Sequence, residues 1–362
     1  MQLRIPGPTP CPAEVLQSMT KEMINHRDRE FSSIFLRVTE KLKKFFQTKN
    51  DVFVLTCSGT GSMEAAVVNT LSPGDEVLAV SCGYFGERYG EMAEAYGAKV
   101  RWLRFEWGEG ADPDAIKKAL DSSPGIKAVL VTHNETSCGM MNKLEAISKV
   151  VKGYNKLLLV DAISSLGSAE LPVDKWDCDV VATASQKGWM APPGVAMVSV
   201  SPAAWEANAR AKMPRVYFDF GKARTFAQKG QTPWTPAVST IFALDKSLEI
   251  MDREGQEKVI ARHKRVAEMT RKGVKDMGLS ILPKEEFASP TVTAVKAPPG
   301  LEVKKFLNLL LDKYGIALAG GQDRLEGKIF RIGHLGKVEE KDIDEVLAGV
   351  RKALPEAGYN IK

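Results

Sequence analysis

The chain has 362 residues, of which 44% are hydrophobic and 26% are charged. A disordered chain would have less apolar content and a larger net charge, so this composition favours a folded protein of about two domains. The net charge is +5, with basic and acidic residues interspersed. A nucleic-acid-binding protein more often gathers its basic residues on one face, so we expect no nucleic-acid partner.

The cysteines do not form a recognisable framework. They are Cys11, Cys57, Cys82, Cys138 and Cys178. Their number is odd and no CxxC pair occurs, which argues against a disulfide scaffold and a cysteine-rich zinc site, so no metal is expected. The chain has no run of about 18 apolar residues, and it opens on neither a signal peptide nor a transit peptide. We therefore expect a cytoplasmic protein with no membrane partner.

The first two thirds of the chain predict an α/β domain. Residues 1–14 are rich in proline, which does not fit inside a helix, and are expected to form an extended arm. Near-continuous apolar runs, typical of strands buried on both faces, then alternate with helical patterns. The expected strands are 52–56, 76–80, 100–105, 126–132, 157–160, 180–183 and 195–200, and the expected helices are 62–71, 86–96, 113–120 and 144–151. This alternation predicts a large domain over residues 15–253, with a mostly parallel sheet flanked by helices.

The pattern changes in the last third of the chain. Two long helices, 237–252 and 254–277, are expected to meet near Gly255. They are followed by expected strands at 292–295, 316–319 and 329–333 and expected helices at 303–314 and 340–354. This mixture predicts a smaller C-terminal α+β domain over residues 254–362.

The first segment that could carry chemistry is Ser58-Gly-Thr-Gly61, which lies between an expected strand and an expected helix. Glycines allow a tight turn, the helix N-terminus carries a partial positive charge, and the two hydroxyl groups add donors, so a phosphate site is one interpretation. A simple capped turn is the other. A dinucleotide fingerprint is disfavoured, because Glu64 stands where its last glycine is required.

Two further residues lie at the carboxyl ends of expected strands. Asp161 follows an apolar run at the edge where open parallel sheets bind ligands, although an aspartate there can also cap the next turn. Lys187 follows the run 180–183 among Ser, Gln and Gly, where a partly buried amine could form a Schiff base. Alone, a lysine at a turn would be unremarkable. A phosphate loop, a strand-end carboxylate and a strand-end lysine together are what pyridoxal phosphate requires.

At this point the chain resembles the class V pyridoxal-phosphate aminotransferases of the alanine–glyoxylate and serine–pyruvate group. The resemblance covers nearly the whole chain and rests on motifs in the family's order. They are Gly7-Pro-Thr9, Ser58-Gly-Thr-Gly61, Cys82-Gly-Tyr-Phe-Gly-Glu-Arg88, Thr132-His-Asn-Glu-Thr-Ser-Cys-Gly139, Asp161-Ala-Ile-Ser-Ser165, Ser185-Gln-Lys-Gly188, Ala191-Pro-Pro-Gly194, Gln231-Thr-Pro-Trp-Thr-Pro236 and Phe330-Arg-Ile-Gly-His-Leu-Gly336. The resemblance implies an aspartate-aminotransferase-like fold and the cofactor pyridoxal 5'-phosphate.

The resemblance also implies roles for individual residues. Lys187 is expected to be the Schiff-base lysine and the acid and base of the proton shift, Asp161 to pair with the ring nitrogen, and Arg331 to clamp the substrate carboxylate beside Gly7. The remaining expected cofactor-binding residues are Ser58, Gly59, Thr60 and Gln186 at the phosphate, Phe85 stacked on the ring, Thr136 at the ring hydroxyl, Ile163, and Thr232 and Thr235 from the partner subunit. Two departures are that Phe85 stands where some relatives have Trp and Thr232 where some have Tyr.

The implied activity is transamination between a small amino acid, alanine or serine, and glyoxylate or pyruvate, in a homodimer with shared active sites. Aspartate or aminoethylphosphonate as donor is an alternative, and Arg27, Arg29, Arg88 and Arg324 are available to bind a second anion. A cysteine desulfurase-like lyase is less favoured, because Gln186 and Phe85 replace the histidines of that subgroup. A catalytically silent scaffold is disfavoured by the intact lysine, aspartate and arginine.

Two neighbouring features have simpler interpretations. The stretch 26–30, His-Arg-Asp-Arg-Glu, is expected to form an ion-pair loop near the dimer interface. His133 is expected to be a hydrogen-bonded strand-end histidine, and Cys57 and Cys138 to fill space in the core.

Overall fold

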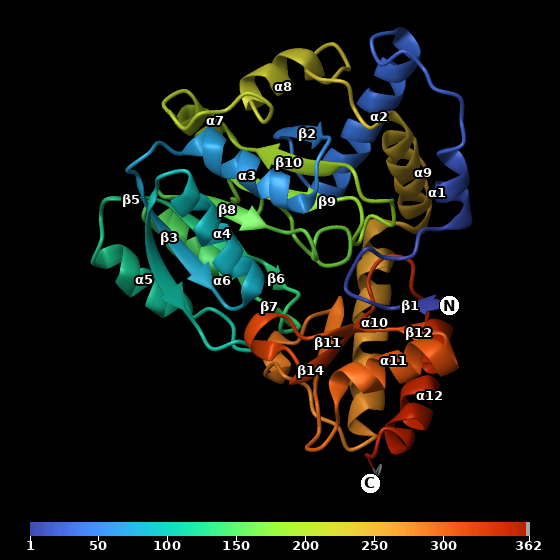
Figure 1. Cartoon of the computed structure of the whole chain (residues 1–362). Coiled ribbons are helices and arrows are strands. Elements are labelled where there is room, and N and C mark those ends of the chain that lie inside the picture. Colours follow the sequence, from blue (N-terminus) through green and yellow to red (C-terminus); the bar gives the residue numbers. More distant parts are fainter. Residues whose placement is uncertain (360–362) are drawn as a thin grey trace.

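The computed structural model describes residues 1–359, and its largest element is a seven-stranded sheet (Figure 1). The strands lie in the order β2-β10-β9-β8-β5-β3-β4. Their bounds are β2 Asp51–Leu55, β3 Glu76–Ser81, β4 Lys99–Arg104, β5 Ile126–Thr132, β8 Leu157–Asp161, β9 Val180–Ala184 and β10 Ala196–Val200. Only β10 is antiparallel to its neighbours, so the mostly parallel sheet is confirmed.

Helices cover both faces of this sheet. Because side chains alternate along a strand, Val52 and Val54 of β2 belong to one buried cluster, and Phe53 and Leu55 belong to another. The first cluster contains residues of α2 (Arg29–Phe46), α5 (Pro113–Asp121), α6 (Leu144–Gly153) and α9 (Val238–Glu254), and the second contains residues of α3 (Gly59–Thr70), α4 (Tyr84–Ala95), α7 (Pro202–Asn208) and α8 (Phe220–Ala227). Burial on both faces explains the continuous apolar runs of these strands.

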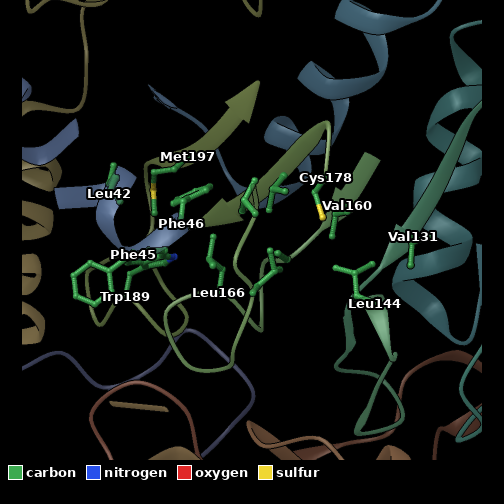
Figure 2. Packing of buried hydrophobic residues seen from close by; sticks show 14 of the residues in the cluster. Leu42, Phe45, Phe46, Val131, Leu144, Val160, Leu166, Cys178, Trp189 and Met197 are labelled. Carbon is green, nitrogen blue, oxygen red and sulfur yellow. The ribbon is translucent and has the colours of Figure 1, made fainter. Parts of the chain in front are cut away.

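The first cluster holds the segment that follows β9 in place. Figure 2 shows Trp189 beside Phe45 and Phe46, with ring centroids 6.0 Å away in both pairs. The Trp189 ring nitrogen donates to Thr183 Oγ1 at 2.9 Å, so the buried indole is also satisfied as a donor. Trp189 thereby fixes the turn two residues after Lys187.

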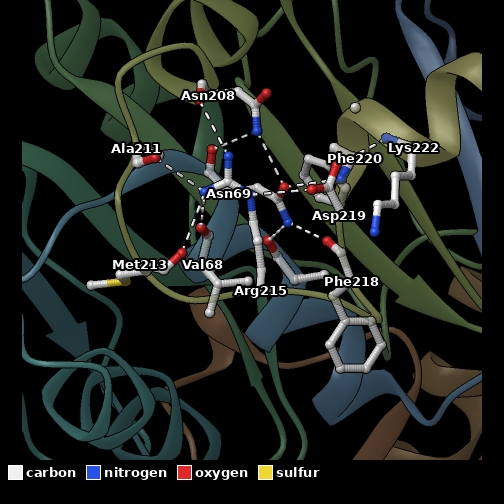
Figure 3. A network of polar contacts seen from close by, with 12 residues as sticks. Val68, Asn69, Asn208, Ala211, Met213, Arg215, Phe218, Asp219, Phe220 and Lys222 are labelled. Atoms are coloured by element: carbon white, nitrogen blue, oxygen red, sulfur yellow. Dashed lines mark hydrogen bonds and ion pairs between the residues drawn. The ribbon is translucent and has the colours of Figure 1, made fainter.

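A polar network fixes the connection between α7 and α8 against α3 (Figure 3). The side chain of Asn69 donates to the backbone oxygens of Ala65 and Phe218, and its own oxygen accepts from Phe220 N at 2.9 Å. Arg215 donates to the backbone oxygen of Val68 at 3.1 Å. Buried backbone groups of this irregular connection are therefore paired by side chains instead of by a strand.

The C-terminal third forms a separate three-stranded sheet with helices. Its strands lie in the antiparallel order β11-β14-β13, and the N-terminal strand β1 pairs with β12 beside it (Figure 1). The bounds are β1 Gln2–Leu3, β11 Val292–Lys296, β12 Ile316–Ala317, β13 Ala319–Gly320 and β14 Ile329–Gly333, with helices α10 Gln256–Lys275, α11 Val303–Tyr314 and α12 Glu340–Glu356. Buried Arg4 forms an ion pair with Asp342 at 2.8 Å, which ties the arm to this sheet's helices.

The expected junction near Gly255 coincides with a break between two helices, because α9 ends at Glu254 and α10 begins at Gln256. The domain bounds 1–14, 15–253 and 254–362 stay a prediction, and residues 360–362 of the last range lie outside the described residues. No helix among residues 1–359 is long and apolar enough to cross a membrane.

Several elements were not expected from the sequence. They are α1 (Ala13–Ser18), α2, α7, α8 and the short strands β1, β6 (Asn134–Glu135) and β7 (Met140–Met141). The ion pairs expected for residues 26–30 are absent among residues 1–359, while the expected position near a dimer interface stays a prediction. Asp28 caps α2 by accepting from Glu30 N and Phe31 N, and Arg27 donates to the backbone oxygens of Thr232 and Pro233 instead of forming an ion pair. This stretch therefore anchors the 231–236 loop.

Candidate active site

A cavity of about 150 Å³ lies at the edge of the large sheet where β2, β3, β5, β8 and β9 have their carboxyl ends. It is lined by Ser58, Gly59, Thr60, Met63, Phe85, Arg88, Thr136, Asp161, Ile163, Ser164, Gln186 and Lys187. Parallel strands end at one edge, and the residues that follow them converge there from distant parts of the chain. Most of the predicted site residues are therefore brought together.

One end of the cavity is suited to an anion. Ser58 is the N-cap residue of α3, but its side chain makes no capping hydrogen bond, and the helix's first N–H donor within the chain is Ser62. The free N–H groups of the first turn and the hydroxyl groups of Ser58 and Thr60 can therefore serve a ligand. Gln186 also lines this end, and its side-chain oxygen is buried without a hydrogen-bond partner among the described residues. That oxygen is an acceptor, so only the NH2 group of the side chain could donate to an anion.

The packing of this end favours glycine at position 59. A Cβ atom at Gly59 would lie 2.6 Å from the side chain of Ile163, which forms the neighbouring wall. The helix start can therefore approach β8 closely, and Ile163 supplies an apolar surface beside the cavity.

Asp161 lines the cavity from the end of β8. Its carboxylate accepts from Ile163 N at 2.9 Å, so the alternative role as a turn cap is also realised. Burial raises the pKa of Asp161 to about 7, against the opposing effects of that hydrogen bond and of Lys187. A buried carboxylate of this kind would be stabilised as an anion by a cationic ring nitrogen.

Lys187 faces the cavity from the turn after β9, partly buried. Its Nζ atom donates to the backbone oxygen of Pro6 at 2.7 Å. Burial lowers the pKa of Lys187 to about 8, and the charge of Arg331 lowers it further, while that of Asp161 raises it. Gly7 lies directly against this amine, because a Cβ at position 7 would approach Nζ to 2.7 Å. The amine is therefore enclosed, and its lowered pKa gives it a larger neutral, nucleophilic fraction at neutral pH than an ordinary lysine has.

Phe85 lies in the first turn of α4, and this turn is capped from another part of the chain. Glu135 Oε2 accepts from the backbone N–H groups of Phe85 and Gly86, both at 3.0 Å, and Ser137 Oγ accepts from Tyr84 N at 3.1 Å. Glu135 is fully buried, and this burial raises its pKa despite the four hydrogen bonds it accepts. The carboxylate thus sets the position of Phe85 at the cavity wall.

Arg331 lies on β14, beside the cavity but not in its lining. It is buried, and its guanidinium donates to the backbone oxygens of Gly320 and Thr136 and to Gln322 Oε1, at 2.8, 3.1 and 2.9 Å. Burial lowers the pKa of Arg331 to about 10, which leaves it charged at neutral pH. Thr136, whose hydroxyl is 2.7 Å from that of Ser164, connects the arginine to the cavity.

The structure does not bring Thr232 and Thr235 to this cavity. Within one chain they line a separate space of about 20 Å³ with Tyr217 and Trp234. Thr232 is buried and donates its hydroxyl to Trp234 O at 2.7 Å, whereas Thr235 is exposed. Of the two threonines, Thr235 is therefore the better placed to reach a second copy of the chain.

Sequence reasoning gave Met63 and Ser164 no role in the site and named Arg88 only as a candidate for a second anion. Arg88 lines the cavity, and its guanidinium lies 4.9 Å from the centre of the Phe85 ring. Its spacing of three residues from Phe85 on one helix could have indicated this. Ser164 belongs to the motif around Asp161 but received no role. Of the other arginines considered for a second anion, Arg27 donates to backbone oxygens and Arg324 stacks on Trp107 at 3.9 Å. Arg29 is not in the cavity lining.

The other residues with simple interpretations behave as expected. His133 is buried and its Nδ1 lies 3.0 Å from Ser165 Oγ, so it is a hydrogen-bonded core histidine. Cys138 is buried in the core, and Cys57 is partly buried against the first turn of α3.

Comparisons with known proteins agree with this geometry. The family described as aminotransferase class V matches residues 3–335. The serine–glyoxylate aminotransferase of Methylorubrum extorquens is 36% identical, over 99% of this chain and 92% of the relative. The solved structure of an alanine–glyoxylate aminotransferase from Nostoc sp. has a TM-score of 0.94 and 30% identity, and the match covers 98% of this chain and 95% of that one.

Another relative is named as a hydrogenase subunit instead of an aminotransferase. The soluble hydrogenase small subunit of Synechococcus sp. (strain PCC 6716) is 47% identical, over 99% of this chain and 94% of the relative. Within residues 1–359, no group of three or more His, Cys, Asp or Glu side chains is arranged to hold a metal ion.

Proposed function

The chain belongs to the class V aminotransferase family, and on that premise we propose that it uses pyridoxal 5'-phosphate to transfer an amino group from alanine or serine to glyoxylate or pyruvate. The observation that carries the proposal is the convergence of three groups. The Lys187 amine and the Asp161 carboxylate face one cavity, and the Arg331 guanidinium lies behind its wall at Thr136. In transamination, the Lys187 amine would attach the cofactor and move the proton, the Asp161 carboxylate would hold the ring nitrogen, and the Arg331 guanidinium would bind the substrate carboxylate.

The residues present fit the proposed cofactor. The anion site at the start of α3, with its free N–H groups and the hydroxyl groups of Ser58 and Thr60, suits a phosphate group, to which the side-chain NH2 group of Gln186 would also donate. When bound, pyridoxal phosphate supplies a carbonyl carbon that an amine can attack and a ring that accepts electron density. Asp161 would keep the ring nitrogen protonated, and Phe85 would cover one face of the ring.

Lys187 would hold the cofactor covalently and then move a proton. Once the substrate amine has displaced it, the free Nζ atom is the base that takes the proton from the substrate Cα and returns it as an acid. A pKa near 8 suits Lys187 both to accept and to donate this proton at neutral pH. Arg331 would bind the α-carboxylate with two parallel hydrogen bonds and so orient the Cα–H bond.

We further propose a homodimer in which Thr235, with Thr232 behind it, approaches the cofactor phosphate of the partner subunit. This is supported by the place of both threonines outside their own chain's cavity and by the anchoring of their loop by Arg27. The substrate pair is supported by the printed activities of the relatives. A cytoplasmic location stays a prediction from the sequence.

Absorbance spectroscopy with a substrate panel tests this function. The protein is loaded with pyridoxal phosphate and mixed with alanine, serine or aspartate, and conversion of the bound cofactor to its amine form is followed. Rapid conversion with alanine or serine supports the proposal. Conversion with aspartate alone would move the assignment to a dicarboxylate donor, for which Arg88 is the arginine in the cavity wall. Release of sulfide from cysteine would instead indicate a lyase.

A further inference from the structure

Arg331 is a buried cation whose acceptors are all uncharged. Its three hydrogen bonds go to two backbone oxygens and to the side-chain oxygen of Gln322. A buried charge is costly unless it is well paired, so this guanidinium favours any carboxylate that can reach it.

Counting the guanidinium hydrogens shows what such a carboxylate must displace. The single hydrogen of Nε is used by Gly320 O, and the two hydrogens of Nη1 are used by Thr136 O and Gln322 Oε1. A carboxylate bound as a fork takes one hydrogen from each of two nitrogens, so Nη2 alone cannot supply the fork. One of the three acceptors therefore has to leave.

Only one of these acceptors is free to move. Gly320 belongs to β13, which pairs with β14 next to Arg331 itself. Thr136 follows β6, and its hydroxyl is held against Ser164. The third acceptor is the end of a flexible, partly buried side chain, that of Gln322.

We propose that Gln322 is a placeholder for the substrate carboxylate. Its amide oxygen occupies Nη1 of Arg331 in the free protein and leaves when a carboxylate binds across Nη1 and Nη2. This inference rests on the proposed function of Arg331 as the carboxylate clamp. Each substrate then exchanges one hydrogen bond for two, and the second hydrogen of Nη1 keeps an acceptor between turnovers.

The backbone around Gln322 is built to stay in place while its side chain moves. A Cβ atom at Gly321 would lie 1.9 Å from Leu325 O, so the turn before the short helix at Asp323–Leu325 is closely packed. Arg324 stacks on Trp107 at 3.9 Å and fastens this turn to the loop after β4. The exchange therefore needs a side-chain rotation and no movement of the loop.

Two substitutions with opposite expected effects test the proposal. Gln322→Ala removes the competitor, and the apparent dissociation constants of alanine and of propionate, an unreactive carboxylate, should fall by about 3- to 10-fold, the worth of one net hydrogen bond. The maximal rate at saturating alanine should change less than the affinity.

Gln322→Glu places an anion on Arg331 and should weaken the binding of both alanine and propionate by about tenfold or more. The affinity should recover as the pH is lowered and the new carboxyl is protonated. Glu326→Ala, an exposed position in the same turn, is the control and should leave both constants unchanged.

Propionate binding is measured by calorimetry on the cofactor-free protein as well, so that the test does not depend on turnover. Unchanged or weaker binding in Gln322→Ala would overturn the placeholder, because Gln322 would then be idle or would support Arg331. So would tighter binding in Gln322→Glu. If the variants change propionate affinity as expected but the wild-type protein converts its cofactor with no amino acid, the proposed function fails while the placeholder stands.

Discussion

The Nζ atom of Lys187 donates a hydrogen bond to the backbone oxygen of Pro6, 2.7 Å away, although 181 residues separate the two in sequence. The arm is fastened on both sides of this contact, by the ion pair between Arg4 and Asp342 before it and by Thr9 after it. Thr9 donates from its backbone N–H to Gln186 O and from its hydroxyl to Lys187 O, both at 3.0 Å. The N-terminal arm therefore encloses the amine and contributes to the burial that lowers its pKa.

The first prediction concerns the pH dependence of covalent cofactor attachment. The amine attacks only when it is unprotonated, and burial lowers the pKa of Lys187 to about 8. The rate at which the cofactor-free protein binds pyridoxal phosphate covalently should therefore rise with pH, with a midpoint near 8, and level off at higher pH. Stopped-flow absorbance from pH 6 to 10 measures this rate. Lys187→Ala should show no covalent phase, and a midpoint near the ordinary lysine value of about 10.4 would contradict the assignment.

The second prediction concerns Gly7. Gly7→Ala would place a methyl group 2.7 Å from Nζ and would strain the backbone, which has φ +139°. We expect the arm to be pushed away and cofactor attachment to slow by about tenfold or more, the equivalent of roughly 1.4 kcal/mol on the barrier. Gly255→Ala is the matched control, because its φ is +85° but nothing lies within 4 Å of the added atom. Equal effects on attachment in the two variants would show that strain, not contact with Lys187, is responsible.

The parts of the site that could be predicted share one physical origin. Ser58, Asp161 and Lys187 follow buried strands, and the carboxyl ends of parallel strands meet at one edge, so chain order alone implies that they converge. Glu135 and Gln322 depend on contacts between distant segments, the capping of α4 and the acceptor of Arg331. No local pattern encodes such contacts.

Helix α2 could have been predicted but was not. Its buried residues Phe31, Phe35, Val38, Leu42, Phe45 and Phe46 recur at helical spacing, and Asp28 precedes them as an N-cap. The cluster of charges at 26–30, which includes this N-cap residue, was interpreted as a set of ion pairs. Arg27 shows why charge alone was misleading, because backbone oxygens satisfy it.

The third prediction concerns Glu135 as the residue that positions Phe85. Glu135→Gln replaces one acceptor oxygen with a donor, and a donor cannot pair with the N–H groups of Phe85 and Gly86 on one side or with the N–H group of Ser137 on the other. Loss of two hydrogen bonds to a charged group should lower the free energy of unfolding by roughly 3 kcal/mol or more. Urea unfolding measures this change, and fluorescence titration should show weaker cofactor binding. Glu87→Gln makes the same chemical change on α4 at a side chain that contacts Ser81 and Arg104, and it should spare cofactor affinity.

The fourth prediction concerns acid stability. Burial lowers the pKa of His133, His263 and His334 to about 3, whereas an unfolded histidine titrates near 6.5. The unfolded chain therefore binds more protons at these sites between pH 3 and 6.5, so their stabilising contribution is complete above pH 6.5 and is lost as the pH falls towards 3. The raised pKa values of Asp161 and Glu135 act in the opposite direction, but they are two groups against three histidines.

Thermal unfolding of the cofactor-free protein from pH 7.5 to 5 tests whether the three buried histidines lower its stability as the pH falls. His263 accepts from Gly336 N with one ring nitrogen and contacts Val259 O with the other, so His263→Gln can keep both contacts while removing one site of proton uptake. The pH dependence should become shallower in this variant. A wild-type stability that is flat or rising towards pH 5 would refute the role of the histidines.

The last prediction separates stability from function at Asp161. Its folded-state pKa of about 7 lies above the unfolded value of about 3.9, so the folded state binds the extra proton and Asp161 favours folding only at low pH. As the pH rises through about 7, the buried carboxylate ionises without a cationic partner in the cofactor-free protein, and stability is lost. Asp161→Asn has nearly the same shape and can still accept from Ile163 N, so the cofactor-free variant should match or exceed the wild type in melting temperature at pH 8.

The rate of transamination by Asp161→Asn should fall by about tenfold to a hundredfold or more, because the neutral amide cannot hold a proton on the ring nitrogen. The size of the loss follows from a charge-assisted hydrogen bond, which is worth roughly 1.5–3 kcal/mol. Differential scanning calorimetry of the cofactor-free proteins and single-turnover absorbance of the loaded ones are the two measurements. A variant that melts well below the wild type at pH 8 would make Asp161 a structural residue, and one that transaminates at the wild-type rate would remove it from the chemistry.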